Sequence, residues 1–198
     1  MNYENPIAHF IDFIEREGFF LIERAIKPDL PFVLSTVSKD GKPSSRVLFL
    51  KQIIEDELIF FTNVESQKGA EMESNPNVSI CVFFEKTNRQ IRIEGQAFVA
   101  SRNLAIEYFK TRPVLSQAGA ILSKQSSKLE NYKEFADSVK RLAETKKELE
   151  CPENWVAFKV KPSEFEFWEG TEFRLHIRTK YKKELNFENK WFRYNLYP

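Results

Sequence analysis

The sequence predicts a mostly β protein with flanking helices, organised as a single domain over residues 1–198. Nineteen of its residues are phenylalanine and several runs are rich in β-branched residues, a composition that favours a β-rich core. Strand-like segments also fall into two groups separated by helical ones, which indicates a closed or split β-barrel with helices packed outside it. The length is sufficient for one hydrophobic core, and no internal repeat or linker divides it.

The amino-terminal third predicts a helix followed by an antiparallel meander. Apolar residues recur at helical spacing over residues 6–17, and Asn5-Pro6 is a plausible helix start. Asp40-Gly41 is a hairpin turn signal, and residues 55–57 form a second turn. The strands expected around these turns are residues 32–38, 46–54 and 58–63.

The middle of the chain alternates helices and strands. Ser66 is a suitable N-cap residue and Pro76 stops the helix that follows, so a short helix is expected over residues 66–75. Residues 114–127 lack clear periodicity and are rich in Ser, Gln and Lys, which predicts mostly a loop. The other elements expected here are strands at residues 78–84 and 89–100 and a helix at residues 101–111.

The clearest helical pattern covers residues 129–149, where an apolar stripe lies opposite a charged face. This pattern predicts an outer amphipathic helix. The carboxyl-terminal part, residues 155–198, predicts further strands at residues 155–160, 165–168, 174–182 and 191–196.

The charge balance excludes several classes of protein. Thirty basic and 29 acidic residues give a net charge of +1, which argues against bulk binding to nucleic acid or to anionic membranes. No run approaches the roughly 18 apolar residues that a membrane helix needs, and the amino terminus has no leader pattern. Two distant cysteines and the lack of any His/Cys/carboxylate cluster predict no metal site and a reducing, cytoplasmic setting.

The segment Arg174-Leu175-His176-Ile177-Arg178 is the strongest candidate for a binding site. If it is a strand, its two arginines and its histidine share one face, because alternate side chains point the same way. Three such groups rarely converge without an anion to neutralise them. The alternative is a solvated edge strand.

Two other clusters have features of phosphate sites. Ser66-Gln67-Lys68 begins a helix, whose free N–H groups and dipole favour anions, although an ordinary N-cap with a surface lysine would look the same. Tyr108 and Arg112 are four residues apart and would share a helix face, with Ser116 nearby. Arg112 could clamp a phosphate, or it could simply be a helix-end arginine.

Taken together, these motifs resemble those of the pyridoxine 5′-phosphate oxidases, in the same order and over nearly the whole chain. The Ser-Lys-Gln-Ser-Ser run and the Arg-Leu-His-x-Arg run are the most specific of them. The segments that carry the resemblance are residues 46–51, 60–63, 66–68, 75–76, 89–90, 108–113, 123–127, 166–168 and 174–178.

The resemblance implies an FMN-binding split barrel that forms a homodimer, with FMN in two clefts at the subunit interface. It also implies an enzyme that oxidises pyridoxine or pyridoxamine 5′-phosphate to pyridoxal 5′-phosphate, with O2 accepting the electrons to give H2O2. In such an enzyme the flavin performs the redox chemistry, and the protein orients the substrate beside it.

The resemblance assigns the site residues of the family to positions of this sequence one by one. The positions that match the FMN shell are Arg46, Lys51, Phe61, Thr62, Gln67, Lys68, Gln90, Gln125, Ser126, Trp168 and Arg178. Those that match the substrate-phosphate clamp are Lys51, Tyr108, Arg112 and Ser116. Arg174 and His176 match the catalytic groups over the pyridine ring, where they would hold the ring and its oxygen. Arg46 and Lys51 are five residues apart, so an ideal strand places them on opposite faces.

The chain departs from the family pattern at several positions, and a covering amino-terminal Arg/Tyr segment is not expected. The departures are Phe61 for Tyr, Gln67 for Arg, Val156-Ala157 for Gly-Gly, Ile177 for Asp and Asn195 for Arg. Residues 66–69 also resemble flavin oxidases of phenazine biosynthesis, which tend to lack the phosphate clamp. Two alternatives therefore stay open: a flavin oxidase for another ring, and a non-catalytic binder of FMN or pyridoxal phosphate.

Overall fold

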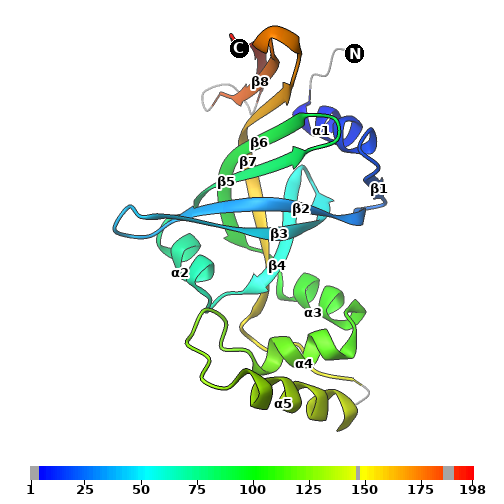
Figure 1. Ribbon diagram of the computed structural model, residues 1–198, viewed down its shortest axis with the longest axis vertical. Coiled ribbons are helices and arrows are strands. Elements are labelled where there is room, and N and C mark those ends of the chain that lie inside the picture. Colours follow the sequence, from blue (N-terminus) through cyan, green and yellow to red (C-terminus); the bar gives the residue numbers. More distant parts are fainter. Residues whose placement is uncertain (1–4, 146–147, 185–189) are drawn as a thin grey trace.

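A closed antiparallel β-barrel forms the body of the protein in the computed structural model, which describes residues 5–145, 148–184 and 190–198. The barrel strands follow the order β4-β3-β2-β5-β6-β7, and β4 pairs back onto β7 to close the ring. Their bounds are β2 Ala25–Val37, β3 Pro43–Ile54, β4 Glu57–Asn63, β5 Asn77–Phe84, β6 Arg89–Val99 and β7 Trp155–Glu169. The mostly β fold and the barrel are thus confirmed (Figure 1).

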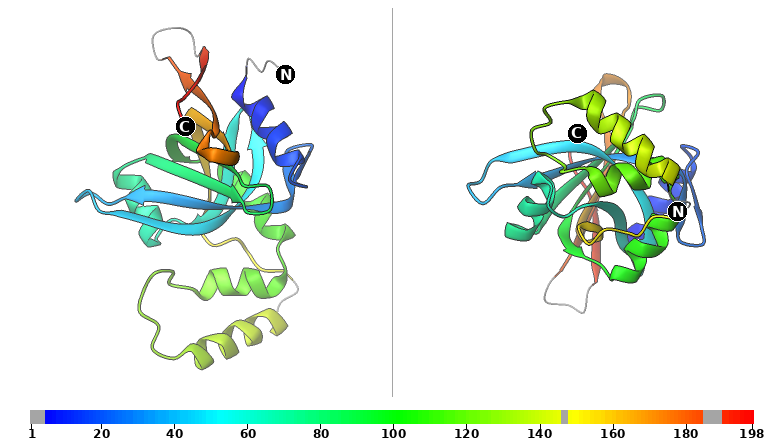
Figure 2. Two further views of the ribbon diagram at one scale, coloured as in Figure 1. Left: turned by 45° about the horizontal axis from the view of Figure 1, so that its top comes forward. Right: turned by 90° about the horizontal axis from the view of Figure 1, so that it is seen from below.

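Additional elements extend the barrel at both ends. A short β1, Phe20–Ile22, pairs with β2, while β8, Ile177–Lys183, and β9, Trp191–Asn195, continue the sheet beyond β7. The helices are α1 Pro6–Glu15, α2 Gln67–Ser74, α3 Arg102–Thr111, α4 Val114–Leu122 and α5 Tyr132–Thr145. Helices α3, α4 and α5 lie at the end of the molecule opposite β8 (Figures 1 and 2).

The prediction of a loop over residues 114–127 was wrong, because α4 occupies the first part of it. Val114, Ala118 and Ile121 recur at helical spacing and pack against α5 and Phe109. The polar residues between them concealed this short stripe. The outer helix also begins later than predicted: α5 starts at Tyr132, which is 76% exposed, and not at residue 129.

The predicted strands at residues 155–160 and 165–168 are one continuous strand, β7. Pro162, which lies between the two predicted segments, pairs with Gly95 where the β6–β7 register shifts. A Cβ at Gly95 would lie 2.3 Å from the carbonyl oxygen of Lys161, so only glycine allows this approach. A second register shift lets β2 begin at Ala25 instead of residue 32, and β1 was not predicted.

Helix α1 closes one end of the barrel. Phe10, Phe13 and Ile14 are fully buried in the main core. The His9 ring stacks on Phe167 with centroids 3.9 Å apart, and its Nδ1 lies 3.2 Å from the hydroxyl of Tyr181.

This position makes His9 a determinant of acid stability. Burial, with a contribution from nearby Arg193, lowers the pKa of His9 from 6.5 to about 4. Between these values the unfolded chain binds a proton that the folded chain does not, so stability is expected to fall as the pH drops below about 6.5. Urea unfolding at several pH values should show this loss, and His9→Gln should show a shallower one. Identical pH profiles for the two proteins would contradict the assignment.

Among the described residues, the structure contains no helix long and apolar enough to cross a membrane. The cytoplasmic location stays a prediction.

Candidate active site

A cavity of about 390 Å³ lies between β4, α4 and the start of β7. Phe61 and Thr62, from β4, line it together with Gln125, from the segment after α4. Arg112 and Ser116 line the same cavity. Residues assigned to the flavin and residues assigned to the substrate phosphate therefore meet at one place in the structure.

Arg112 is the most unusual group in this cavity. Its guanidinium lies over the ring of Trp155, 4.1 Å from the centroid, and its buried Nη1 has no hydrogen-bond partner among the described residues. Burial lowers the pKa of Arg112. The ring centroid of Phe109 lies 5.7 Å from the same guanidinium. The two aromatic rings hold this cation where an anion could complete its hydrogen bonds.

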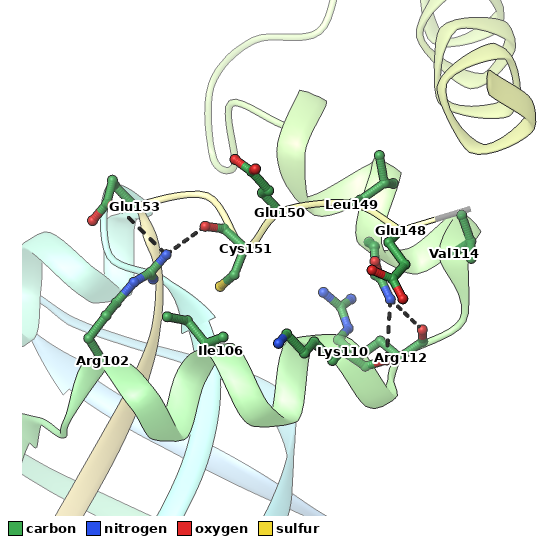
Figure 3. A pocket seen from close by; sticks show the side chains of 11 residues that line it. Arg102, Ile106, Lys110, Arg112, Val114, Glu148, Leu149, Glu150, Cys151 and Glu153 are labelled. Carbon is green, nitrogen blue, oxygen red and sulfur yellow. Dashed lines mark hydrogen bonds and ion pairs between the residues drawn. The ribbon is translucent and has the colours of Figure 1, made fainter. Parts of the chain in front are cut away.

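Arg112 also lines a larger cavity, of about 840 Å³ (Figure 3). It is lined by α3, by the start of α4 and by residues 148–153. Lys110 and Arg112 both line this cavity, but Glu148, Glu150 and Glu153 line it as well. Because basic and acidic side chains both line it, the larger cavity is less suited to an anion than the smaller cavity is.

Tyr108 and Lys51 lie next to the smaller cavity, but not in the way that the spacing suggested. Helix α3 ends at Thr111 and Arg112 has extended backbone angles, so Tyr108 and Arg112 do not share a helix face. Tyr108 instead stacks on Phe61 with ring centroids 3.9 Å apart. The Nζ of Lys51 lies 5.6 Å from the Tyr108 ring centroid.

Lys51 and Arg46 leave β3 in different surroundings, as the sequence predicts. Lys51 forms an ion pair with Asp29 on the side of Tyr108. Arg46 contacts the side chains of Thr36 and Glu71 instead. The two side chains therefore have different partners, as expected for residues five apart on a strand.

The start of α2 forms the polar end of the site. Ser66 caps the helix, as predicted, and its hydroxyl accepts a hydrogen bond from Gly69 N. Lys68 Nζ donates to Ser66 Oγ at 2.8 Å and to Gln125 Oε1 at 3.2 Å. The backbone N–H of Gln67 donates to Ser126 Oγ at 3.2 Å.

The environment of Lys68 favours an anion nearby. Burial, reinforced by Arg46, lowers the pKa of Lys68 to about 8, although Glu71 opposes the shift. Two cations held close together in a partly dehydrated place repel one another, and a phosphate would relieve that repulsion.

The remaining predicted residues form a second group at the far end of β7. Gln90 on β6, Trp168 on β7 and Arg178 on β8 are direct neighbours across the sheet. The ring of His176 lies 4.7 Å from that of Trp168, and Thr171 N donates to His176 Nδ1 at 3.3 Å.

The prediction that one strand carries Arg174, His176 and Arg178 was wrong. Strand β8 begins only at Ile177, and Arg174 ends a 3₁₀ helix, η1, Glu172–Arg174. Arg174 and its neighbour Phe173 have positive φ angles of 60° and 56°, which no strand allows. The turn makes Arg174 an exposed residue at the tip of a loop, whereas Arg178 is bound to Glu166 at 2.8 Å.

The two groups do not meet within one chain. Trp155, beside Arg112, begins β7, and Trp168 lies near its other end. At about 3.3 Å per residue, the strand carries these two residues roughly 40 Å apart along its length. Figure 1 shows the corresponding separation between α4 and the β8 end of the molecule.

Two carboxylates that bind predicted site residues were not anticipated as part of the site. Glu71 and Glu166 are buried and bind Arg46 and Arg178, respectively. Glu71 follows Gln67 by one helical turn, which is the only sequence signal for it. Within the described ranges, no group of His, Cys, Asp and Glu side chains could hold a metal ion.

The barrel places the protein in a known structural class. It superposes with a TM-score of 0.89 on PhzG from Burkholderia lata, solved in complex with tetrahydrophenazine-1-carboxylic acid, at 27% identity over 99% of this chain and 94% of that one. A pyridoxamine 5′-phosphate oxidase-related, FMN binding protein from Nostoc punctiforme shares the fold with a TM-score of 0.74, 17% identity and coverage of 100% and 99%.

The sequence comparison is more specific. Residues 22–146 match the pattern described as pyridoxamine 5′-phosphate oxidase, and residues 155–198 match the pyridoxine 5′-phosphate oxidase C-terminal dimerisation region. The chain belongs to the pyridoxamine 5′-phosphate oxidase family. The second match supports a homodimer.

Individual relatives agree with this family. The pyridoxine/pyridoxamine 5′-phosphate oxidase of Rhodopirellula baltica is 39% identical over 197 residues, which cover 98% of this chain and 87% of that protein. The enzyme of the same name from Haemophilus influenzae is 36% identical over 197 residues, with coverage of 99% and 90%.

Proposed function

We propose that this protein oxidises pyridoxine 5′-phosphate or pyridoxamine 5′-phosphate to pyridoxal 5′-phosphate, with FMN as cofactor and O2 as electron acceptor. The observation that carries the proposal is the half-buried Arg112, whose buried Nη1 lacks a hydrogen-bond partner among the described residues, in a cavity shared with flavin-site residues. A phosphate supplies the acceptors that this group lacks.

The residues fit the phosphate of FMN. Arg46 and Lys68 supply positive charge beside the start of α2, and Gln125 and Ser126 supply hydrogen-bonding groups next to them. When bound, FMN accepts two electrons from the substrate and passes them to O2, giving H2O2.

The chain's own residues bind and orient the substrate. Arg112 and Lys51 neutralise its phosphate, and the hydroxyls of Tyr108 and Ser116 add donors. Arg174 and His176 hold the pyridine ring and its oxygen, so that the carbon to be oxidised faces the flavin.

A complete site requires both subunits, because the two residue groups lie at opposite ends of β7. Apolar side chains on the outer face of the barrel favour a second copy as the covering surface: Val47 is 63% exposed, Phe49 50% and Phe83 56%. We place FMN in clefts between the subunits, each composed of the Arg112 group from one subunit and the His176 group from its partner. Residues 1–198 act as one unit in this arrangement.

Anaerobic mixing with pyridoxamine 5′-phosphate tests the proposal. The flavin absorbance should bleach, and readmitted O2 should restore it with release of H2O2. Dephosphorylated pyridoxamine should bleach it far more slowly, because Arg112 and Lys51 would have no phosphate to bind. Equal rates with and without the phosphate would contradict the proposed substrate.

The likeness to PhzG favours a second candidate, a flavin oxidase for another ring such as a dihydrophenazine. Bleaching by a dihydrophenazine but not by either vitamin phosphate would favour this candidate. Bound flavin that neither class of compound reduces would instead indicate a non-catalytic binder.

A further inference from the structure

A buried carboxylate lies among the cations at the proposed phosphate end of the flavin site. Glu71, on α2, is only 6% exposed. Its Oε2 accepts hydrogen bonds from the hydroxyls of Thr36 and Ser44, the latter at 2.7 Å, and its Oε1 accepts one from Gln67 Nε2 at 2.9 Å. Nη2 of Arg46 lies 3.4 Å from Oε2.

The carboxylate is ionised, although its position disfavours a negative charge. Burial by itself would raise the pKa of Glu71, but the hydrogen bonds from Thr36, Ser44 and Gln67, together with Arg46, hold that pKa at about 2. An ionised carboxylate repels a phosphate and weakens the field of the cations around it. Its place beside a phosphate site therefore needs a compensating role.

The hydrogen bonds of Arg46 indicate what that role is. Its Nη1 donates to Thr36 Oγ1 at 2.6 Å and to Leu34 O at 3.2 Å, and its Nη2 donates to Ser44 Oγ at 2.6 Å. The hydroxyls of Thr36 and Ser44 thus bridge the guanidinium and the carboxylate of Glu71.

The ionised carboxylate sets the direction of this network. Because it has acceptors only, Thr36 and Ser44 must turn their protons toward Glu71. Their lone pairs then face Arg46, which has donors only. A group with an N–H at the position of Glu71 could turn either hydroxyl around and leave the guanidinium without its acceptors.

We propose that Glu71 is a positioning residue that presets the Arg46 guanidinium for the phosphate of FMN. The inference rests on the proposed function, because it assumes that FMN is the cofactor. Its consequence is selectivity for FMN over riboflavin, which has the same ring system but no phosphate.

The substitution Glu71→Gln tests this role, because a positioning role and simple charge removal predict opposite changes in FMN affinity. The variant should bind FMN about tenfold more weakly, since Arg46 loses its fixed orientation, while riboflavin affinity should change by less than about twofold. Simple charge removal predicts the opposite, tighter binding of FMN. Flavin fluorescence quenching by the flavin-stripped full-length protein measures both affinities, and circular dichroism confirms folding.

Glu164→Gln is the matched control. Glu164 is also a partly buried glutamate paired with cations, Lys180 and Lys182, but it lies on β7 and contacts neither α2 nor Arg46 in the described structure. This control should leave the FMN-to-riboflavin affinity ratio unchanged. Equal losses of both flavins in Glu71→Gln, or tighter FMN binding, would overturn the proposal.

The variant Arg46→Gln tests whether Glu71 affects FMN binding through Arg46 or by another route. Adding Glu71→Gln to Arg46→Gln should not lower the affinity ratio further, because there is no guanidinium left to orient. A further tenfold loss in the double variant would overturn the proposal. If Glu71→Gln does not fold, Ser44→Ala should give a smaller loss in the FMN-to-riboflavin affinity ratio. An unchanged ratio in Ser44→Ala would then overturn the proposal.

Titration of the wild-type protein with FMN and riboflavin distinguishes a failure of the proposed function from a failure of the proposed role of Glu71. A wild-type protein that binds neither flavin would overturn the proposed function and this inference together. A wild-type protein that prefers FMN, with a Glu71→Gln variant that keeps the same preference, would overturn only the role of Glu71.

Discussion

Arg112→Ala is expected to lower kcat/KM for pyridoxamine 5′-phosphate by about 100-fold, mainly through KM, because truncating one partner of a buried charge pair costs several kcal/mol. Flavin content should stay the same, since Arg112 lies over Trp155 and not beside Arg46 or Lys68. Steady-state release of H2O2 and the absorbance of the bound flavin measure the two quantities.

Lys110→Ala is the control for Arg112→Ala. Lys110 lines the larger cavity with Arg112 but does not line the smaller one (Figure 3). Its loss should change KM by less than about threefold, the scale of an exposed charge at a distance. An equal effect of both substitutions would place the phosphate in the larger cavity.

Local periodicity and turn chemistry predict most of the barrel. Asp40-Gly41 marks a hairpin because Gly41 takes a positive φ of 79°, and strands β3 to β6 lie within a few residues of their predicted bounds. Tertiary contacts decide the remainder. Helix α4 depends on packing against α5, and β7 passes through Pro162 because Gly95 on the neighbouring strand leaves room for it.

Spacing alone is a poorer guide to the candidate site. The face shared by Arg174, His176 and Arg178 does not exist, because a 3₁₀ turn ends at Arg174. Tyr108 and Arg112 do not share a helix face either, because α3 stops between them. The resemblance to a family proposed the same residues without needing either argument, since it depends on order along the chain and not on local geometry.

Buried partners of the arginines are the part that the sequence conceals. Glu71 looks like a solvent-facing helix residue, and Glu166 looks like the polar side of an alternating strand. Both are buried because Arg46 and Arg178, distant in sequence, fold against them. Such pairs depend on sheet register and helix placement, which no single segment encodes.

The second large effect is expected in mixed dimers. Arg112→Ala in one subunit and a combined Arg174→Ala, His176→Ala change in the other each damage a different residue group. If every site takes one group from each subunit, a mixed dimer has one site with all the changes and one intact site. At a substrate concentration far below the raised KM of Arg112→Ala, both parent homodimers should be nearly inactive, whereas the mixed dimer should show about half the wild-type activity.

Activity of the mixed dimer is the most direct test of the central claim, that the two ends of β7 serve different active sites. Subunits carrying different affinity tags can be co-expressed, and the doubly tagged dimer can be purified and assayed with pyridoxamine 5′-phosphate. Recovery of about half the wild-type rate is the result expected from two shared sites. A mixed dimer as inactive as its parents would mean that each site draws both groups from one chain, and would contradict the account.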